Sequence, residues 1–192
     1  LNESELFSGV ILEREVVNPK MPKRVEQAKI ALLDCWLRVS QQNFRRKLEI
    51  HIEDTKDYSI HLDTLNKLAE DTVEKIKNAG ANVVLSTKIV DDLTEHFLTK
   101  YRILTVTQLP SMDLKIISEA TGGKIITDLN DLKKENLASA KAVEEKKIGE
   151  KKTVFVNLPG SKCATILIRG ATEDMLSEGE RILLSLLKVL KT

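Results

Sequence analysis

Residues 29–33 read Lys29-Ile30-Ala31-Leu32-Leu33, an almost unbroken apolar run of strand length. A strand with one wet face alternates apolar and polar residues, so a run that is apolar on both faces is typical of a sheet centre covered on both sides. We therefore predict that this stretch is a central core strand. Pro19 and Pro22 precede it and predict an extended turn between it and an earlier strand at 10–12.

Strand and helix patterns alternate through the rest of the chain. Between 58 and 79 apolar residues recur every three or four positions, which predicts one long amphipathic helix that Gly80 ends in a left-handed conformation. The other predicted elements are strands at 82–85, 105–107 and 124–127, and helices at 91–98 and at 112–120, the latter capped by Ser111. This alternation predicts an α/β fold.

Four further regions carry less regular patterns. Residues 48–53 alternate with period two and predict a strand, whereas the lysine- and glutamate-rich stretch 130–152 predicts a surface meander. Residues 153–156 and 164–168 predict a hairpin that turns at Pro159-Gly160. The last predicted helix opens at Thr172 and holds more apolar residues than a solvated surface needs, so we expect it to have a packing partner.

Length and composition restrict the class of protein. The 192 residues suggest one domain with an appendage, and 42% hydrophobic and 31% charged residues are typical of a soluble globular protein. Lys+Arg 30 against Asp+Glu 29 leaves a net charge of +1, and aromatic residues are 4% of the chain, so we expect no nucleic-acid partner. No apolar run in the sequence is long enough for a membrane span, and the first residues do not form a signal-peptide pattern.

These features predict a cytoplasmic protein. The chain begins with Leu1 rather than methionine, which suggests an excised fragment. Its two cysteines, Cys35 and Cys163, are expected to be buried reduced thiols in a reducing compartment, with a disulfide as the alternative.

The search for catalytic motifs gives few candidates. Neither a Walker A loop nor a G-x-G-x-x-G motif is present. Asp92 and His96 are one helical turn apart, a spacing that suits two metal ligands, but without another nearby ligand in the sequence we expect no metal site. Ser161 and Cys163 have no identifiable base. The cluster 45–47, Arg-Arg-Lys, fits a solvated loop or a contact for an acidic partner.

Seven stretches of the chain resemble the apical domain of group II chaperonins, the family of the archaeal thermosome and eukaryotic TRiC/CCT. They follow the family's order and spacing and are GVILEREVVNPKMP (9–22), AKIALLD (28–34), GANVV (80–84), DDLTEHFL (91–98), ATGG (120–123), VEEKKIG (143–149) and TILIRG (165–170). The resemblance implies a chaperonin apical-domain fold, an α/β fold with a β-sandwich core flanked by helices and a helical protrusion.

The resemblance also divides the chain. Residues 1–162 are similar to the apical, client-binding domain, with the protrusion at about 41–71, and residues 163–192 are similar to the strand and helix that return to the intermediate domain. In that family the protrusion serves as a built-in lid. We expect Phe44, Tyr58, Ile60, Leu62 and Leu65 to belong to it.

The resemblance implies that the parent subunit binds ATP and Mg²⁺, hydrolyses ATP and assembles with sister subunits in a double ring. The chain itself contains no G-D-G-T-T phosphate loop, so we expect no cofactor in it and no enzyme activity of its own. Ser185 stands where the family has its hydrolysing aspartate, which leaves the parent's ATPase activity uncertain. An assembly scaffold without ATPase activity is therefore the alternative function.

By resemblance the helices 91–101 and 111–121 line the folding chamber, and the second contacts unfolded polypeptides. The sequence of helix 111–121 supports this role in part. Its apolar residues lie on too many sides of the helix for all of them to face one core. We expect a client-binding surface at Met112, Lys115, Ile116 and Glu119. Two alternatives stay open, namely that both helix faces are packed within the domain, and that the chain is a small α/β enzyme with a deep polar pocket.

Overall fold

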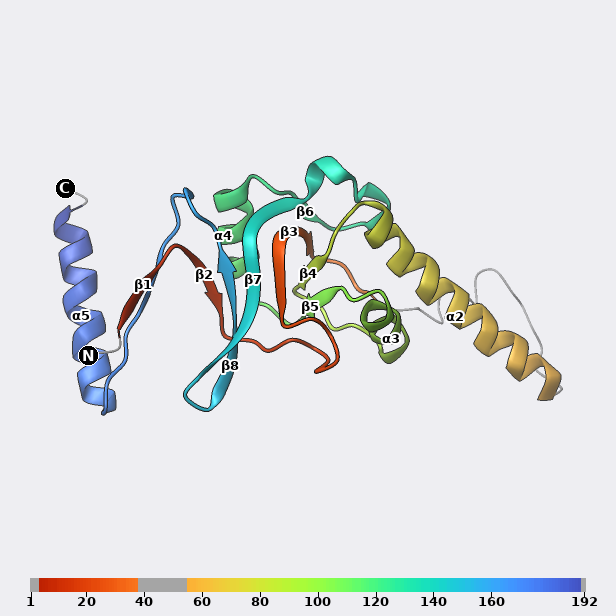
Figure 1. Ribbon diagram of the computed structural model, residues 1–192, viewed down its shortest axis with the longest axis horizontal. Coiled ribbons are helices and arrows are strands. Elements are labelled where there is room, and N and C mark those ends of the chain that lie inside the picture. Colours follow the sequence, from red (N-terminus) through yellow and green to blue (C-terminus); the bar gives the residue numbers. More distant parts are fainter. Residues whose placement is uncertain (1–3, 38–54, 191–192) are drawn as a thin grey trace.

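The computed structural model describes residues 4–37 and 55–190, and its core is a seven-stranded mixed sheet (Figure 1). The sheet runs in the order β2-β8-β7-β3-β4-β5, with β6 also paired to β3. Its strands are β2 (Gly9–Leu12), β3 (Arg24–Leu33), β4 (Val83–Ser86), β5 (Leu104–Val106), β6 (Ile125–Ile126), β7 (Ala138–Ile148) and β8 (Lys151–Asn157). A separate two-stranded sheet pairs β1 (Glu5–Phe7) with β9 (Thr165–Leu167).

Strand β3 lies at the centre of the large sheet, as predicted. It pairs in parallel with β4 along 30–33 and with β6 at Leu32 and Leu33, and it pairs antiparallel with β7 through the rest of its length. The side chains of Ile30, Leu32 and Leu33 are fully buried. The parallel strands β3, β4, β5 and β6 are joined by helices, so the α/β fold class is confirmed.

The predicted helices are present as α2 (Thr55–Asn78), α3 (Asp92–Lys100), α4 (Ser111–Thr121) and α5 (Glu173–Leu190). Two short 3-10 turns, η1 (Leu129–Asp131) and η2 (Lys134–Asn136), lie between β6 and β7. Gly80 and Gly122 follow α2 and α4 with φ of 88° and 73°, the left-handed conformation that ends a helix. The prediction that Ser111 caps α4 is wrong, because Pro110 occupies the cap and Ser111 is already helical.

The stretch predicted as a surface meander contains the longest strand of the sheet. Strand β7 lies between β3 and β8, and Ala138, Ala140 and Val143 are buried on it. Its alternation of alanine with serine and lysine is a weak strand signal in isolation, since alanine has low strand propensity. Its two neighbouring strands supply the hydrogen bonds and the apolar surface that make it a strand.

The predicted hairpin between 153–156 and 164–168 is also wrong. Strand β8 pairs with β2 on one side and β7 on the other, so neither of its edges is free for β9. Strand β9 pairs instead with β1. The Pro159-Gly160 turn is present, but it redirects the chain out of the sheet.

Other predictions concern membrane segments, the cysteines and residues 38–54. Among the described residues, no helix has both the length and the apolar character that crossing a bilayer requires.

Cys35 and Cys163 are unpaired and only partly buried, so the disulfide alternative is wrong. The predicted strand 48–53, the basic cluster 45–47 and Phe44 lie outside the described residues.

The junction between α4 and β7 depends on the absence of a side chain at Gly123. A Cβ atom there would lie 2.6 Å from the Cβ and 2.8 Å from the Cα of Ala138. We predict that Gly123→Ala lowers the free energy of unfolding by about 3 kcal/mol, because a backbone atom must move to make room. Urea denaturation followed by circular dichroism measures this change.

Gly160→Ala is the matched control for that measurement. A Cβ atom at Gly160 meets no neighbour within 4 Å, and φ is 80° there, so only the conformational cost of about 1 kcal/mol is expected. Equal losses in the two variants would contradict the packing argument.

Candidate functional site

Helix α4 has one buried face and one uncovered face. Leu114 and Ile117 are 1% and 0% exposed and pack into the core, whereas Met112 is 66% and Ile116 36% exposed. The helix packs against β2, β6 and β7 through its buried face. The alternative in which both faces are packed within the domain is therefore wrong for this chain.

The uncovered face combines apolar and charged side chains. Met112, Lys115, Ile116 and Glu119 are all exposed, and their spacing of three and four residues places them on one side of the helix. All four residues expected at the client-binding surface are thus accessible, and their contact with a client stays a prediction. We call these four residues the α4 face.

Local hydrogen bonds order the carboxyl end of α4. At its carboxyl end, the Thr121 hydroxyl donates to the Ile117 carbonyl at 2.6 Å, and the Ser118 hydroxyl donates to the Gly123 carbonyl at 2.6 Å. These bonds fix the turn that follows the last residue of the helix. A surface held in this way presents its side chains without first having to order them.

Charged groups border the amino end of the α4 face. The Arg14 Nε donates to the Gln108 carbonyl at 3.1 Å and fixes the loop after β2 beside the start of α4. Partial burial, followed by the carboxylate of Glu13, raises the pKa of Asp113, and Arg14 offsets part of that shift. The α4 face is therefore apolar in its middle and charged at its rim.

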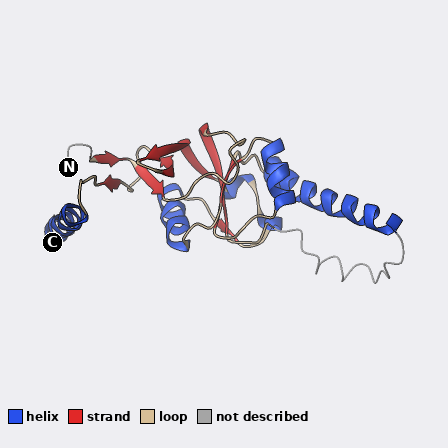
Figure 2. Ribbon diagram, turned by 90° about the horizontal axis from the view of Figure 1, so that it is seen from below, coloured by secondary structure: helices blue, strands red, loops and turns tan. Residues whose placement is uncertain are grey.

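Helix α2 extends away from the sheet (Figures 1 and 2). Its carboxyl-terminal half is anchored, because Ala69, Val73 and Ile76 are fully buried. Lys100 Nζ and the Tyr101 hydroxyl both donate to Glu70 Oε1, at 3.1 and 3.2 Å, which ties α2 to α3 and lowers the pKa of Glu70.

The predicted protrusion residues other than Phe44 lie in the part of α2 that precedes its buried half. Tyr58, Ile60 and Leu62 are in this helix, and Leu65, which is half-buried, lies one turn before the anchored half. The predicted long helix is therefore confirmed, while its role as a lid stays a prediction.

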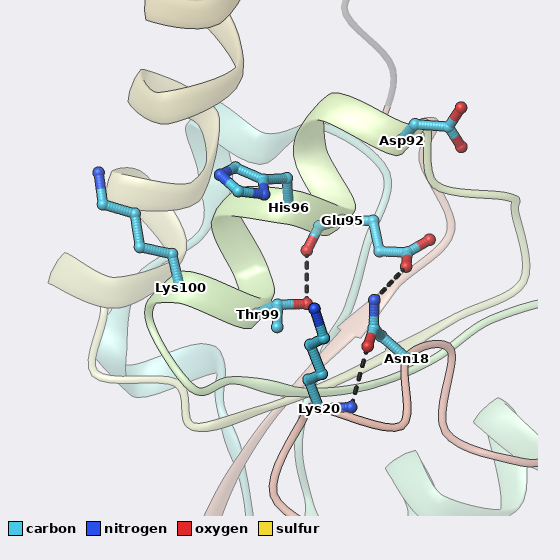
Figure 3. Close-up of a pocket in the computed structure, with 7 residues that line it drawn as sticks. All are labelled: Asn18, Lys20, Asp92, Glu95, His96, Thr99 and Lys100. Carbon is cyan, nitrogen blue, oxygen red and sulfur yellow. Dashed lines mark hydrogen bonds between the residues drawn. The ribbon is translucent and has the colours of Figure 1, made fainter.

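An open hollow of about 390 Å³ lies beside α3 (Figure 3). Its lining residues are Asn18, Lys20, Asp92, Glu95, His96, Thr99 and Lys100. Asn18 Nδ2 donates to Glu95 Oε1 at 2.8 Å, and Asn18 Oδ1 accepts from the Lys20 backbone N–H at 2.9 Å. These bonds fasten the proline-containing loop after β2 to the helix.

Asp92 and His96, whose spacing in the sequence suits two metal ligands, do not form a metal site in this hollow. The Asp92 carboxylate and the His96 ring point in different directions (Figure 3). In the two described ranges, 4–37 and 55–190, no three His, Cys, Asp or Glu side chains gather at a distance that suits a metal ion. We assign this hollow a structural role.

Helix α5 lies at one end of the molecule, beside the two-stranded sheet of β1 and β9 (Figure 1). None of its residues is buried. Its large exposed apolar side chains are Met175, Ile182, Leu184, Leu186, Leu187, Val189 and Leu190. The expectation that this helix has a packing partner stays a prediction, because none of its residues is buried against the described part of the chain.

The fold is that of an α/β domain in which one face of helix α4 leaves apolar side chains uncovered. A sequence model of the TCP-1/cpn60 chaperonin family matches residues 1–192, and this chain belongs to that family. The resemblance to group II chaperonins is confirmed.

Individual relatives agree with this assignment. The chain is 41% identical over 192 residues to a thermosome subunit of Pyrococcus abyssi, covering all of this chain and 34% of that protein. It is 43% identical over 182 residues to the thermosome subunit alpha of Aeropyrum pernix, covering 94% of this chain and 32% of that protein. The chain thus spans about a third of the length of these curated relatives.

A solved structure also resembles the whole chain. It is the open-state monomer of a group II chaperonin from Methanococcoides burtonii, with a TM-score of 0.76 and 31% sequence identity. The match covers 98% of this chain and 40% of that one. The expected chaperonin fold is therefore confirmed.

The two faces of α4 are expected to respond differently to truncation. Ile117→Ala should lower the free energy of unfolding by about 2 to 5 kcal/mol, because it leaves a cavity in the core. Ile116→Ala should cost less than about 1 kcal/mol, because the side chain already meets solvent. Urea denaturation of both variants measures the difference, and similar losses would show that α4 is packed on both sides.

The thiol of Cys35 is expected to react slowly. Burial, followed by the carboxylates of Asp128 and Asp34, raises its pKa from the ordinary value of 9.0 to about 11. The reactive thiolate is then about 100-fold scarcer at pH 8 than for an ordinary thiol.

Alkylation of a Cys163→Ser variant by iodoacetamide, followed by mass spectrometry from pH 7 to 11, isolates the Cys35 thiol. The rate should rise steeply only as the pH approaches 11, and it should increase in urea. Equal rates for the folded and unfolded chain at pH 8 would overturn the assignment.

Proposed function

We propose that this chain is the client-binding and built-in lid domain of an ATP-dependent group II chaperonin that assists protein folding. The observation that carries the proposal is the α4 face, where Met112 and Ile116 are uncovered on a helix whose opposite side is locked into the core. Unfolded polypeptides expose apolar side chains, which such a surface can bury. Lys115 and Glu119 beside them can pair with polar groups of the client.

The size of the α4 face fits weak, reversible binding. Full burial of one Met or Ile side chain is worth about 1.5 to 3 kcal/mol, and association costs an estimated 4 to 15 kcal/mol. A single domain should therefore bind a client poorly. In a ring of sister subunits, several such faces raise the effective concentration of binding sites, and release follows when the faces are rotated out of reach.

The lid role is assigned to the protrusion at about 41–71, with Phe44, Tyr58, Ile60, Leu62 and Leu65. It is supported by helix α2, which extends outward from an anchored base at Ala69 and Val73. A rigid helix fixed at one end can carry a cover over a chamber.

The division of the chain is also a proposal. We assign 1–162 to the apical domain and 163–192 to the strand and helix that return to the intermediate domain. The separate pairing of β9 with β1, away from the seven-stranded sheet, supports it. The exposed apolar side chains of α5 support it too, because the relatives are about three times as long as this chain and so have further residues to cover them.

ATP and Mg²⁺ are assigned to the parent subunit rather than to this chain. Position 185 does not fit the hydrolysing role, because the Ser185 hydroxyl is uncharged and donates to the Arg181 carbonyl at 2.9 Å. A carboxylate is needed there to accept a proton or to face a cation. We therefore derive no catalytic step from this chain.

The alternative function, an assembly scaffold without ATPase activity, is favoured by Ser185 alone. Phosphate release by the intact parent subunit distinguishes the two functions: turnover supports the ATP-driven chaperonin, and its absence supports the scaffold. In both cases the proposed partners are unfolded or partly folded polypeptides and sister subunits in a double ring, in the cytoplasm.

The proposed client contact is tested by replacing the central apolar residue of the α4 face. We predict that Ile116→Asp weakens the suppression of aggregation of a chemically denatured protein, shifting the required chain concentration by about tenfold, or ~1.4 kcal/mol. Light scattering during dilution of the denatured protein measures this shift.

Ile89→Asp is the matched control, since Ile89 is 48% exposed and lies outside α4. It should leave the suppression unchanged. If the two variants behave alike, or if neither differs from the unmodified chain, the α4 face is not the client-binding surface.

A further inference from the structure

A second hollow, of about 460 Å³, lies between the carboxyl end of α2 and the η1–η2 segment. It is lined by Lys75, Asn78, Ala79, Leu129, Asn130, Leu132, Lys133 and Lys134. Three lysines and two asparagines thus surround two leucines, and the lining contains no carboxylate. We call it the lysine hollow.

The positive charge of the lysine hollow is a local imbalance in a chain whose net charge is only +1. Elsewhere lysines pair with carboxylates, for example Lys100 with Glu70 at 3.1 Å and Lys152 with Glu15 at 3.2 Å. Within the described ranges, Lys75, Lys133 and Lys134 form no such ion pair.

Hydrogen bonds link the Asp128 carboxylate to one lysine of the hollow through Asn130. Asp128 Oδ1 accepts from the backbone N–H and the Nδ2 of Asn130, at 2.9 and 3.0 Å. Asn130 Oδ1 in turn accepts from Lys75 Nζ at 2.9 Å, so this amide positions one of the lysines in the wall of the hollow. Asp131 does not line the hollow.

Backbone hydrogen bonds engage carbonyl groups at the carboxyl end of α2. A helix carboxyl end carries partial negative charge on its open carbonyl groups. Here the carbonyls of Lys75, Ile76 and Lys77 accept from the backbone N–H groups of Ala79, Ala81 and Gly80. The charged side chains that line the hollow are all lysines.

We propose that the lysine hollow binds acidic segments of client polypeptides through their side-chain carboxylates. This inference rests on the proposed client-binding function and adds a chemical preference to it. The ammonium groups pair with the carboxylates, and Leu129 and Leu132 contact apolar side chains next to them. The volume is in the range of small-ligand pockets, so it accommodates a short segment rather than a folded domain.

The lining favours peptide carboxylates over phosphate groups. It contains no arginine, whose fork of donors suits phosphate, and it lies at a helix carboxyl end rather than the amino end where phosphates bind. The two leucines would also have no contact with a free phosphate ion.

The test uses a short fluorescein-labelled peptide rich in glutamate with interspersed leucine, and its matched peptide with glutamine at every glutamate position. Fluorescence anisotropy with the 192-residue chain should show binding of the acidic peptide only. Lys133→Glu combined with Lys134→Glu should weaken this binding by about fivefold to tenfold, because two attractions become repulsions. Salt at about 1 M should also weaken it, since the Debye length falls to about 3 Å.

Lys147→Glu combined with Lys151→Glu is the charge-matched control, because both lysines are exposed near the β7–β8 turn, outside the lysine hollow. It should leave the affinity within about twofold. Equal weakening in the two double variants would show a general charge effect and overturn the proposal, and so would undetectable binding of the acidic peptide.

Two further measurements distinguish a carboxylate site from a phosphate site, and the lysine hollow from the α4 face. If millimolar inorganic phosphate displaces the peptide, or if a phosphoserine peptide binds more tightly, the site is a phosphate site and the proposal fails. Ile116→Asp should retain binding of the acidic peptide. Loss of aggregation suppression in Ile116→Asp with intact peptide binding supports both sites, whereas unchanged suppression with intact peptide binding would overturn only the α4 assignment.

Discussion

The burial of strand β3 between neighbours on both edges is the constraint on which the rest of the molecule depends. Ile30, Leu32 and Leu33 have no exposed surface, and the strand is hydrogen-bonded to β4, β6 and β7. Because β6 returns to β3 after β5, the chain between them must cross the sheet, and α4 makes that crossing. Leu114 and Ile117 bury one side of this helix, so Met112 and Ile116 on the other side remain uncovered.

Local patterns predicted the elements whose signals are strong in their own sequence. The apolar run of β3 identified the sheet centre, and the apolar stripe of α2 together with Gly80 identified a long helix and its end. The face of α4 could also be predicted, because the apolar residues of this helix exceed what one core contact can bury.

Elements decided by distant partners could not be predicted in this way. Strand β7 is alanine-rich and charged, and it is a strand inside the sheet because it pairs with β8, which follows it directly, and with β3, which lies far away in the chain. The predicted pairing of β9 with β8 is wrong for a similar reason. Strand β2, from the other end of the chain, pairs with the edge of β8 that a hairpin with β9 would need. No local pattern predicts the lysine hollow, because Lys75 is separated from Lys133 and Lys134 by more than fifty positions.

The chain presents two chemically different surfaces on a rigid frame. The α4 face offers apolar contact with a charged rim, and the lysine hollow offers cationic groups around two leucines. Unfolded polypeptides carry both apolar and acidic side chains, so contacts at two separate sites would add without requiring a defined client shape. On the proposed function, each contact would be weak in isolation, so a bound client would remain releasable.

Site-specific photocrosslinking tests the central claim most directly. A benzoylphenylalanine residue is placed at position 116 in one variant and at position 89 in another, and each is irradiated with a denatured client protein. The account predicts client adducts at position 116 in clear excess over position 89. Equal yields at the two positions, or adducts at position 89 alone, would contradict it.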